Sequence, residues 1–198
     1  MKIAIDIDEV LADGLGSYLN YFNTTYGTQY RKEDFGPEKS FWESLDVAPE
    51  RIAEVMERYD DSPLSRDWYV WPGAQEGIAR LKDKHELIVI SNRMPPRFET
   101  SRVWLEKNFP GAFGEVYFTE SERDGDVRPS KAEIGKRYGV EILVDDNLRE
   151  ALLAAEDGMR VSLFNNALNQ GEVPSNVVRV KGWEEVERVL EAMGEVRD

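Results

Sequence analysis

The feature that most constrains this chain is a regular alternation of short apolar segments with segments of helical spacing, which begins after Pro72 and Gly73. Short apolar runs predict buried strands, and strands that alternate with helices predict a parallel sheet covered on both faces. The predicted strands are 86–92, 115–119, 140–146, 159–164 and 177–180. The predicted helices are 74–84, 97–108, 130–138, 148–156 and 183–193.

One more strand is predicted at residues 2–7, far ahead of this alternation. Residues 14–71 follow it, contain more than half of the aromatic residues, and have helical spacing at 15–22 and 52–59. We therefore predict an α/β fold with a Rossmann-like parallel sheet flanked by helices. Residues 1–13 and 72–198 would form the catalytic core, and residues 14–71 a small helical cap inserted after the first strand.

The amino-acid composition argues against several classes of partner and metal site. A net charge of −14 argues against a nucleic-acid polymer as partner, because that affinity comes largely from Lys and Arg contacts to phosphates. The lack of cysteine excludes disulfides and thiolate zinc sites, and the single histidine, His85, argues against a multi-histidine metal centre. No apolar run approaches the ~20 residues that cross a bilayer, so we predict a cytoplasmic protein without a membrane partner. The oligomeric state stays open.

Polar side chains follow three of the predicted strands. In parallel sheets, sites form beyond the carboxyl ends of the strands, near the switch in strand order. The first predicted strand ends in Asp6-Ile7-Asp8, and Lys131 lies at the start of the helix before strand 140–146. The other strand-end residues are Ser91, Asn92, Asp145 and Asp146. We expect these residues to meet at one edge of the sheet.

The acidic residues among them favour a divalent cation. Asp6 and Asp8 are two apart and, on a strand, would project to the same side. Carboxylates held that close repel one another unless a cation lies beside them. Asp146, on a neighbouring strand, would add a third, and an oxygen-rich site of this kind suits Mg²⁺.

Four segments in order resemble a known family. DIDEVLAD (6–13), Ser91, Lys131 and LVDDN (143–147) resemble the four motifs of haloacid dehalogenase-like phosphohydrolases. More narrowly, the chain is similar to the cytosolic 5′(3′)-deoxyribonucleotidases in WPGAQEGIARL (71–81), VISNR (89–93), VWLEKNF (103–109) and VDDN. The resemblance implies a Mg²⁺-dependent phosphatase acting on a small phosphorylated metabolite, in particular a (deoxy)nucleoside monophosphate.

The resemblance also implies a role for each strand-end residue. Asp6 would attack the phosphorus and form an aspartyl-phosphate, and Asp8 would protonate the leaving oxygen and later deprotonate water. Mg²⁺ would be held by the carboxylates of Asp6 and Asp146 and by the backbone carbonyl of Asp8. The phosphoryl group would be bound by Ser91, the N–H of Asn92 and Lys131, with Asp145 orienting Lys131.

Simpler structural explanations compete with these roles. Asp6 and Asp8 could cap turns, Ser91 could satisfy a backbone group, and Lys131 could be an ordinary solvated lysine. Asp145 or Asp146 could be the N-cap of the helix at 148–156. Aromatic side chains such as Phe22, Phe41 and Trp42 could stack on a base or pack within the cap.

Two other functions stay open. A phosphatase of sugar phosphates or another small metabolite would use the same chemistry, and a non-catalytic phosphate-sensing module would resemble response-regulator receivers. Glu9 departs from the family, in which many members have Gly or Thr there, and it could shift the pKa of Asp8 or reshape the turn. The RMPPR loop (93–97) could contact a substrate phosphate or ribose.

Overall fold

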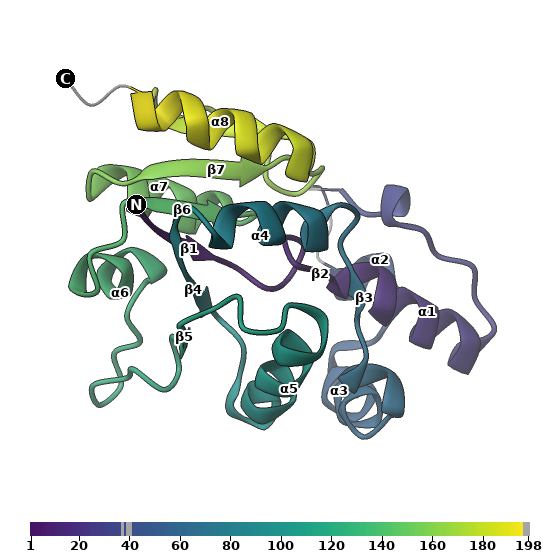
Figure 1. Cartoon of the computed structure of the whole chain (residues 1–198). Helices are drawn as coiled ribbons and strands as arrows, with labels where there is room; N and C mark the ends of the chain where they lie inside the picture. Colours follow the sequence, from purple (N-terminus) through teal and green to yellow (C-terminus); the bar gives the residue numbers. More distant parts are fainter. Residues whose placement is uncertain (37, 39–40, 196–198) are drawn as a thin grey trace.

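The structure, a computed structural model, describes residues 1–36, 38 and 41–195. Residues 37, 39–40 and 196–198, which fall in the predicted cap and at the end of the predicted core, lie outside the described residues. The core is a six-stranded sheet with the order β5-β4-β1-β6-β7-β8 (Figure 1). Its strands are β1 (Lys2–Ile5), β4 (Glu86–Ser91), β5 (Glu115–Phe118), β6 (Ile142–Asp145), β7 (Arg160–Phe164) and β8 (Val177–Val180).

Every neighbouring pair of strands in this sheet is parallel, so all carboxyl ends lie at one edge. β1 lies between β4 and β6, and Ile3 is in register with Leu87 on one side and Ile142 on the other. The chain adds β4 and β5 on one side of β1 before it returns to place β6 on the other. The switch in strand order therefore falls around β1, where ligand sites form in such sheets.

Helices cover both faces of the sheet (Figure 1). One face packs against α4 (Ala74–Lys82), α5 (Phe98–Asn108) and α8 (Trp183–Glu195). The other packs against α6 (Lys131–Arg137) and α7 (Leu148–Glu156). The strands are apolar on both sides because both sides are buried. The predicted α/β fold class is confirmed.

Residues 14–71 are called the insert, and those of them that the structure describes form helices with an apolar cluster of their own that includes Tyr18, Phe22 and Tyr59. A short antiparallel pair joins the insert to the core, β2 (Ala12–Asp13) with β3 (Tyr69–Val70). Its α-helices are α1 (Gly14–Tyr26), α2 (Phe41–Ser44) and α3 (Ile52–Asp60). Its 3₁₀ turns are η1 (Lys32–Asp34), η2 (Pro49–Arg51) and η3 (Pro63–Arg66). A further 3₁₀ turn, η4 (Pro95–Arg97), lies in the core.

The first strand is shorter than the sequence predicts. β1 ends at Ile5, and the chain then turns sharply, with the backbone N–H groups of Leu11 and Ala12 both donating to the carbonyl of Ile7. The prediction that the first strand continues to Asp8 is therefore wrong. The backbone N–H of Asp6 still donates to the carbonyl of Val144 at the end of the ladder, but Asp8 lies in the turn, where alternation along a strand does not set its direction.

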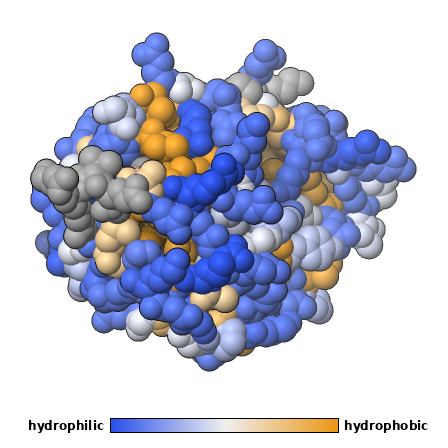
Figure 2. Space-filling model, turned by 45° about the horizontal axis from the view of Figure 1, so that its top comes forward, coloured by the Kyte–Doolittle hydropathy of each residue, from blue (hydrophilic) through white to orange (hydrophobic). Residues whose placement is uncertain are grey.

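The face of the molecule on which α8 lies is mostly hydrophilic, with hydrophobic areas between hydrophilic ones (Figure 2). Within the described ranges, the structure contains no helix with the length and apolar character needed to span a membrane.

Candidate active site

The ends of β4, β1 and β6 surround a cavity of about 370 Å³. The described residues that line it include six of the seven candidate site residues, namely Asp6, Asp8, Ser91, Asn92, Lys131 and Asp146. The seventh, Asp145, is fully buried beside Lys131. The core edge of the cavity also carries Arg93, Met94 and Arg97, and the insert contributes Met56 and Asp60.

Lys131 lies at the centre of the site. Ser130 caps α6 by accepting from the backbone N–H of Glu133, which makes Lys131 the first residue of the helix. Its Nζ lies 2.8 Å from both Asp6 Oδ2 and Asp145 Oδ2, and its side chain is 1% exposed. Burial alone would lower the pKa of Lys131, but the two carboxylates outweigh it and hold the pKa above the ordinary value. The solvated-lysine explanation is wrong.

Three carboxylates gather beside this ammonium group. Oxygens of Asp6, Asp145 and Asp146 all lie within 4.8 Å of one another. Asp145 is already engaged, since its Oδ2 accepts from Lys131 and its Oδ1 accepts from the backbone N–H of Asn147 at 2.8 Å. The cluster thus contains Asp145 where the sequence suggested the carboxylate of Asp8.

The electrostatics of the cluster favour a cation. Burial raises the pKa of Asp6 to about 7, against the lowering effect of Lys131, and repulsion from Asp145 and Asp8 adds to the rise. Burial also raises the pKa of Asp146 well above its ordinary value. The free donors are all oxygens, which fits Mg²⁺ better than zinc or copper.

Two buried polar atoms at this cavity have no hydrogen-bond partner among the described residues, Asp6 Oδ1 and Ser91 Oγ. An unpaired buried hydroxyl or carboxylate oxygen costs free energy, so native structures rarely keep one without a ligand or a reason. Ser91 Oγ does not satisfy a backbone group, which removes the structural explanation offered above. Both atoms are available to a bound molecule.

Asp8 pairs with Arg93, whereas Asp6 pairs with Lys131. Arg93 donates from Nε to Asp8 Oδ2 at 2.8 Å and from Nη2 to Oδ1 at 2.6 Å. Partial burial works to raise the pKa of Asp8, but the charge and hydrogen bonds of Arg93 outweigh it, and the pKa lies below the ordinary value. A Cβ on Gly14 would come within 2.9 Å of Asp8 Oδ1, so a side chain there would displace the Asp8 carboxylate.

Sequence reasoning missed Glu150, a buried carboxylate on α7. Its Oε2 accepts from the backbone N–H of Lys131 at 3.0 Å, and its Oε1 accepts from Asn92 Nδ2 at 3.2 Å. Thr119 Oγ1 donates to Asn92 Oδ1 at 2.8 Å from the other side. Glu150 therefore ties the loop after β4 to the start of α6. An acidic residue in a first helical turn is common, so its type and place did not single it out.

Sequence reasoning also missed two asparagines in the loop after β7. Asn166 Nδ2 donates to Asp146 Oδ2 at 3.1 Å, and Asn169 Nδ2 donates to the carbonyl of Asp146 at 2.6 Å. The run NNALN directly after a predicted strand, at the same sheet edge, was the available signal. The N-cap of α7 is Asn147, which accepts from Glu150 N, so the suggestion that Asp145 or Asp146 caps this helix is wrong.

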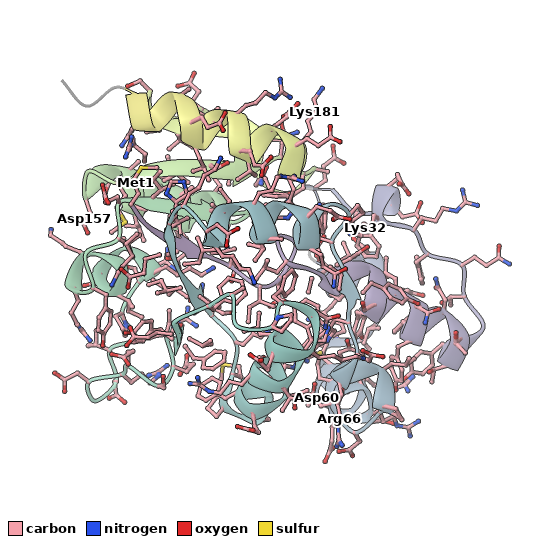
Figure 3. The ribbon with its side chains drawn as sticks, in the orientation of Figure 1. Met1, Lys32, Asp60, Arg66, Asp157 and Lys181 are labelled. Carbon is pink, nitrogen blue, oxygen red and sulfur yellow. The ribbon has the colours of Figure 1, made fainter. Side chains whose placement is uncertain are left out.

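Glu9 adopts a left-handed backbone conformation in the turn after β1. Its φ of 56° is in the left-handed region, where glycine fits without strain. Its carboxylate accepts from the backbone N–H of Leu15 at 2.7 Å and pairs with Lys32 Nζ at 2.9 Å. Lys32 belongs to η1 of the insert and lies near the junction with the core (Figure 3). Glu9 therefore ties the insert to the core.

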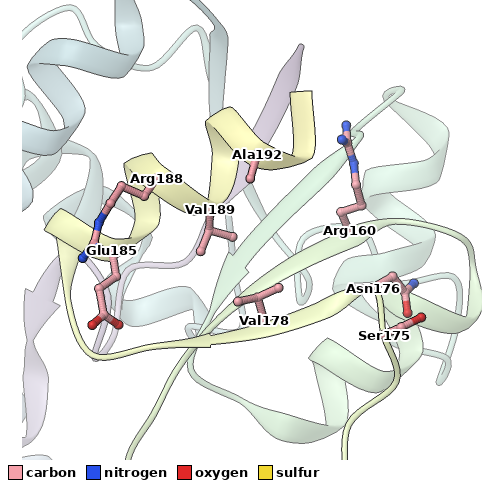
Figure 4. A pocket seen from close by; sticks show the side chains of 8 residues that line it. All are labelled: Arg160, Ser175, Asn176, Val178, Glu185, Arg188, Val189 and Ala192. Atoms are coloured by element: carbon pink, nitrogen blue, oxygen red, sulfur yellow. The ribbon is translucent and has the colours of Figure 1, made fainter. Parts of the chain in front are cut away.

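A larger cavity, of about 540 Å³, lies between β8 and α8 (Figure 4). Its lining includes the apolar residues Val178, Val189 and Ala192 and the charged residues Arg160, Glu185 and Arg188. Large apolar cavities are a common place for ligands. This one lacks a cluster of acidic groups and unpaired buried polar atoms among its described residues, so chemistry rather than size selects the smaller cavity.

Comparison with known proteins identifies the family of this chain. Residues 1–194 match the family model described as 5′ nucleotidase, deoxy (pyrimidine), cytosolic type C protein. The chain belongs to this nucleotidase family. It is therefore a phosphoric monoester hydrolase of the haloacid dehalogenase-like type, which argues against the receiver-like, non-catalytic alternative.

Individual relatives give the same picture. The 5′(3′)-deoxyribonucleotidase of Bacillus subtilis is 28% identical over 190 residues, which are 95% of this chain and 97% of the relative. A haloacid dehalogenase-like protein of unknown function from Agrobacterium tumefaciens has the same fold, with a TM-score of 0.68 at 19% identity over 98% of each chain. The hydrolase YfnB from Bacillus subtilis, bound to magnesium, has a TM-score of 0.62 at 14% identity and covers 96% of this chain and 98% of its own.

Proposed function

We propose that this nucleotidase family member is a Mg²⁺-dependent phosphomonoesterase that works through an aspartyl-phosphate on Asp6. The observation that carries the proposal is the pairing of buried Lys131 with Asp6 and Asp145, beside an unpartnered Asp6 Oδ1 and Ser91 Oγ in one cavity. A nucleophile, an ammonium group and a free hydroxyl donor are the parts that phosphoryl transfer needs.

Asp6, Asp146 and the backbone carbonyl of Asp8 would hold the cation. When bound, Mg²⁺ supplies positive charge that neutralises the phosphoryl oxygens. The raised pKa values of Asp6 and Asp146 support this assignment, because carboxylates crowded together without a cation tend to keep a proton. Asn166 and Asn169 would keep Asp146 in place for the ion.

The protein residues would carry the reaction in two steps. In the first, Asp6 forms a bond to phosphorus while the ester P–O bond breaks, and Asp8 gives a proton to the leaving oxygen. In the second, water attacks phosphorus, Asp8 takes a proton from that water, and the Asp6–phosphate bond breaks to release inorganic phosphate. Ser91, the N–H of Asn92 and Lys131 stabilise the charge on the transferring group.

The insert would act as the cap that covers this cavity and excludes water. Asp60 at the end of α3 (Figure 3) accepts from Arg97 Nε at 3.0 Å and from Arg97 Nη2 at 2.6 Å. Both residues line the cavity, so the pair joins the insert to the core across the site. A leaving group would lie next to this pair and to Met56.

A (deoxy)nucleoside monophosphate is the proposed substrate, supported by the family and by relatives named as 5′(3′)-deoxyribonucleotidases. A sugar phosphate or other small metabolite is the second candidate. The observation in its favour is that the described lining residues of the cavity include no aromatic side chain for a base to stack on. Phe22, Phe41 and Trp42 pack in the apolar cluster of the insert instead.

A substrate panel tests the proposal. With Mg²⁺ present, we expect release of inorganic phosphate from nucleoside monophosphates, with a higher kcat/KM than from any sugar phosphate. Chelation by EDTA should remove the activity on every substrate, and renewed Mg²⁺ should restore it. A clear preference for sugar phosphates would contradict the nucleotide assignment, and full activity in EDTA would contradict the metal assignment.

Stability in EDTA should depend on pH in a specified direction. Folded Asp6 has a pKa of about 7 against 3.8 for an ordinary aspartate, so between these values the folded protein holds a proton that the unfolded chain lacks. The free energy of unfolding should therefore fall as pH rises from about 4 to about 7, by roughly 4 kcal/mol at most for this group. Urea unfolding across this range, with Asp6→Asn as the variant that should flatten the slope, measures it.

In the same experiment, the stabilisation of the protein by Mg²⁺ should increase as pH rises. A cation displaces protons from its carboxylate ligands, so it should stabilise the protein more at about pH 8 than at about pH 5. Equal stabilisation at the two pH values would contradict a site built on Asp6 and Asp146.

A further inference from the structure

The guanidinium of Arg93 is held by contacts from several elements. Its side chain is 3% exposed, Nη1 donates to Ser101 Oγ at 2.9 Å, and Cζ lies 3.7 Å from the centre of the Trp68 ring. Ser101 Oγ donates in turn to the carbonyl of Arg97 at 2.6 Å, and Trp68 Nε1 donates to Tyr59 OH at 3.1 Å. Contacts from α5 and from the insert therefore fix the plane of the guanidinium.

The remaining edge of this group faces Asp8 through two hydrogen bonds, one to each carboxylate oxygen. The Asp8 side chain is 45% exposed although Arg93 is buried. A buried charge is a costly way to stabilise a loop, whereas two parallel hydrogen bonds fix the position and plane of a carboxylate. Asp8 is thus an accessible carboxylate whose position and plane are fixed by a buried arginine.

We propose that Arg93 is the positioning residue for Asp8. The inference rests on the proposed function. Arg93 keeps its own protons throughout. The two hydrogen bonds from Arg93 favour the ionised form of Asp8, so Asp8 takes up a proton from solvent before the first step. It gives this proton to the leaving oxygen as the ester bond breaks and takes one back from the attacking water as the second P–O bond forms. Arg93 sets where the carboxyl group meets each oxygen.

The test compares two leaving groups in Arg93→Met. An alkyl phosphate needs a proton on its leaving oxygen, whereas 4-nitrophenolate leaves without one. For a reaction through a phosphoenzyme, kcat/KM reports only the steps up to phosphoryl transfer to Asp6, so the later use of Asp8 as a base does not enter. We expect kcat/KM on the best alkyl substrate of the wild type to fall at least about 10-fold more than kcat/KM on 4-nitrophenyl phosphate.

Other variants provide reference values for this difference between the two substrates. Asp8→Asn removes the proton donor and should give the largest difference between the substrates, about 10²–10⁴-fold. Arg93→Lys keeps the charge but loses the two-pronged geometry, and Ser101→Ala removes one support of Arg93, so both should give smaller shifts in the same direction. Arg80→Met removes an arginine that pairs with Glu187 on the surface, and it should leave the ratio unchanged.

The outcomes separate the two proposals. Turnover by the wild type, with equal losses on both substrates in Arg93→Met and no shift in Ser101→Ala, would overturn the positioning role and leave the phosphatase in place. Absence of turnover on every phosphate ester by the wild type would overturn the proposed function and this inference with it. If Arg93→Met does not fold, the ratio in Ser101→Ala and Arg93→Lys decides.

Discussion

Asp6→Asn is expected to lower kcat at least about 10⁴-fold on every substrate while the protein stays folded. The amide has nearly the shape of the carboxylate and can still accept from Lys131, but it cannot form an acyl phosphate. The loss should fall on kcat because the cavity that binds the substrate keeps its walls. Release of inorganic phosphate measures turnover, and circular dichroism checks the fold.

The control is Asp157→Asn, the same substitution at a carboxylate that pairs with Lys136 on the far side of the molecule (Figure 3). It should leave kcat unchanged. If Asp6→Asn retained more than about a tenth of the wild-type kcat, the nucleophile would be another group. Labelled substrate gives independent evidence, since acid-quenched wild-type protein should carry phosphate and the Asp6→Asn variant should not.

Lys131→Met is expected to remove activity and to destabilise the protein. The substitution leaves Asp6 and Asp145 facing each other, buried, without the ammonium group between them. Breaking a buried ion pair by deleting one partner costs about 3–5 kcal/mol. In a chain of this size that corresponds to a decrease in Tm of about 6–20 °C.

Lys136→Met is the matched control, because Lys136 lies on the same helix and its pair with Asp157 is exposed. Its effect should stay below about 1 kcal/mol. Thermal melts with and without Mg²⁺ measure both variants, and Mg²⁺ should recover part of the stability lost in Lys131→Met by restoring a positive charge. Equal Tm values for the two variants would contradict a stabilising role for the buried ion pairs of Lys131.

Much of the fold could be predicted because its patterns are local. The helix at 148–156 and the strand at 177–180 have the predicted bounds, since a short apolar run or a helical period is visible within a few residues. The end of the first strand was predicted two residues too late. The apolar character of Ile7 continues the pattern, but its carbonyl closes a tight turn instead of a sheet ladder.

The site could be predicted only as a set of residues. Placement at strand ends singled out Asp6, Asp8 and Ser91, and placement at the start of a helix singled out Lys131. It did not point to Arg93 as the partner of Asp8, or to Glu150 as the link between Asn92 and Lys131. The hydrogen bond from Arg93 to Asp8 joins residues 85 positions apart, and the one from Asn92 to Glu150 joins residues 58 positions apart. No local sequence pattern encodes such a pair.

The sequence by itself determined the alternating α/β architecture and the chemical groups at the strand ends, because strands and helices have periods that are visible in short segments. Only the tertiary structure decided which carboxylate pairs with which basic side chain. That choice depends on the order β4-β1-β6, which brings Lys131 between Asp6 and Asp145, and on the turn after β1, which directs Asp8 to Arg93. Strand order is set by the packing of the whole core, so it is not written in any one segment.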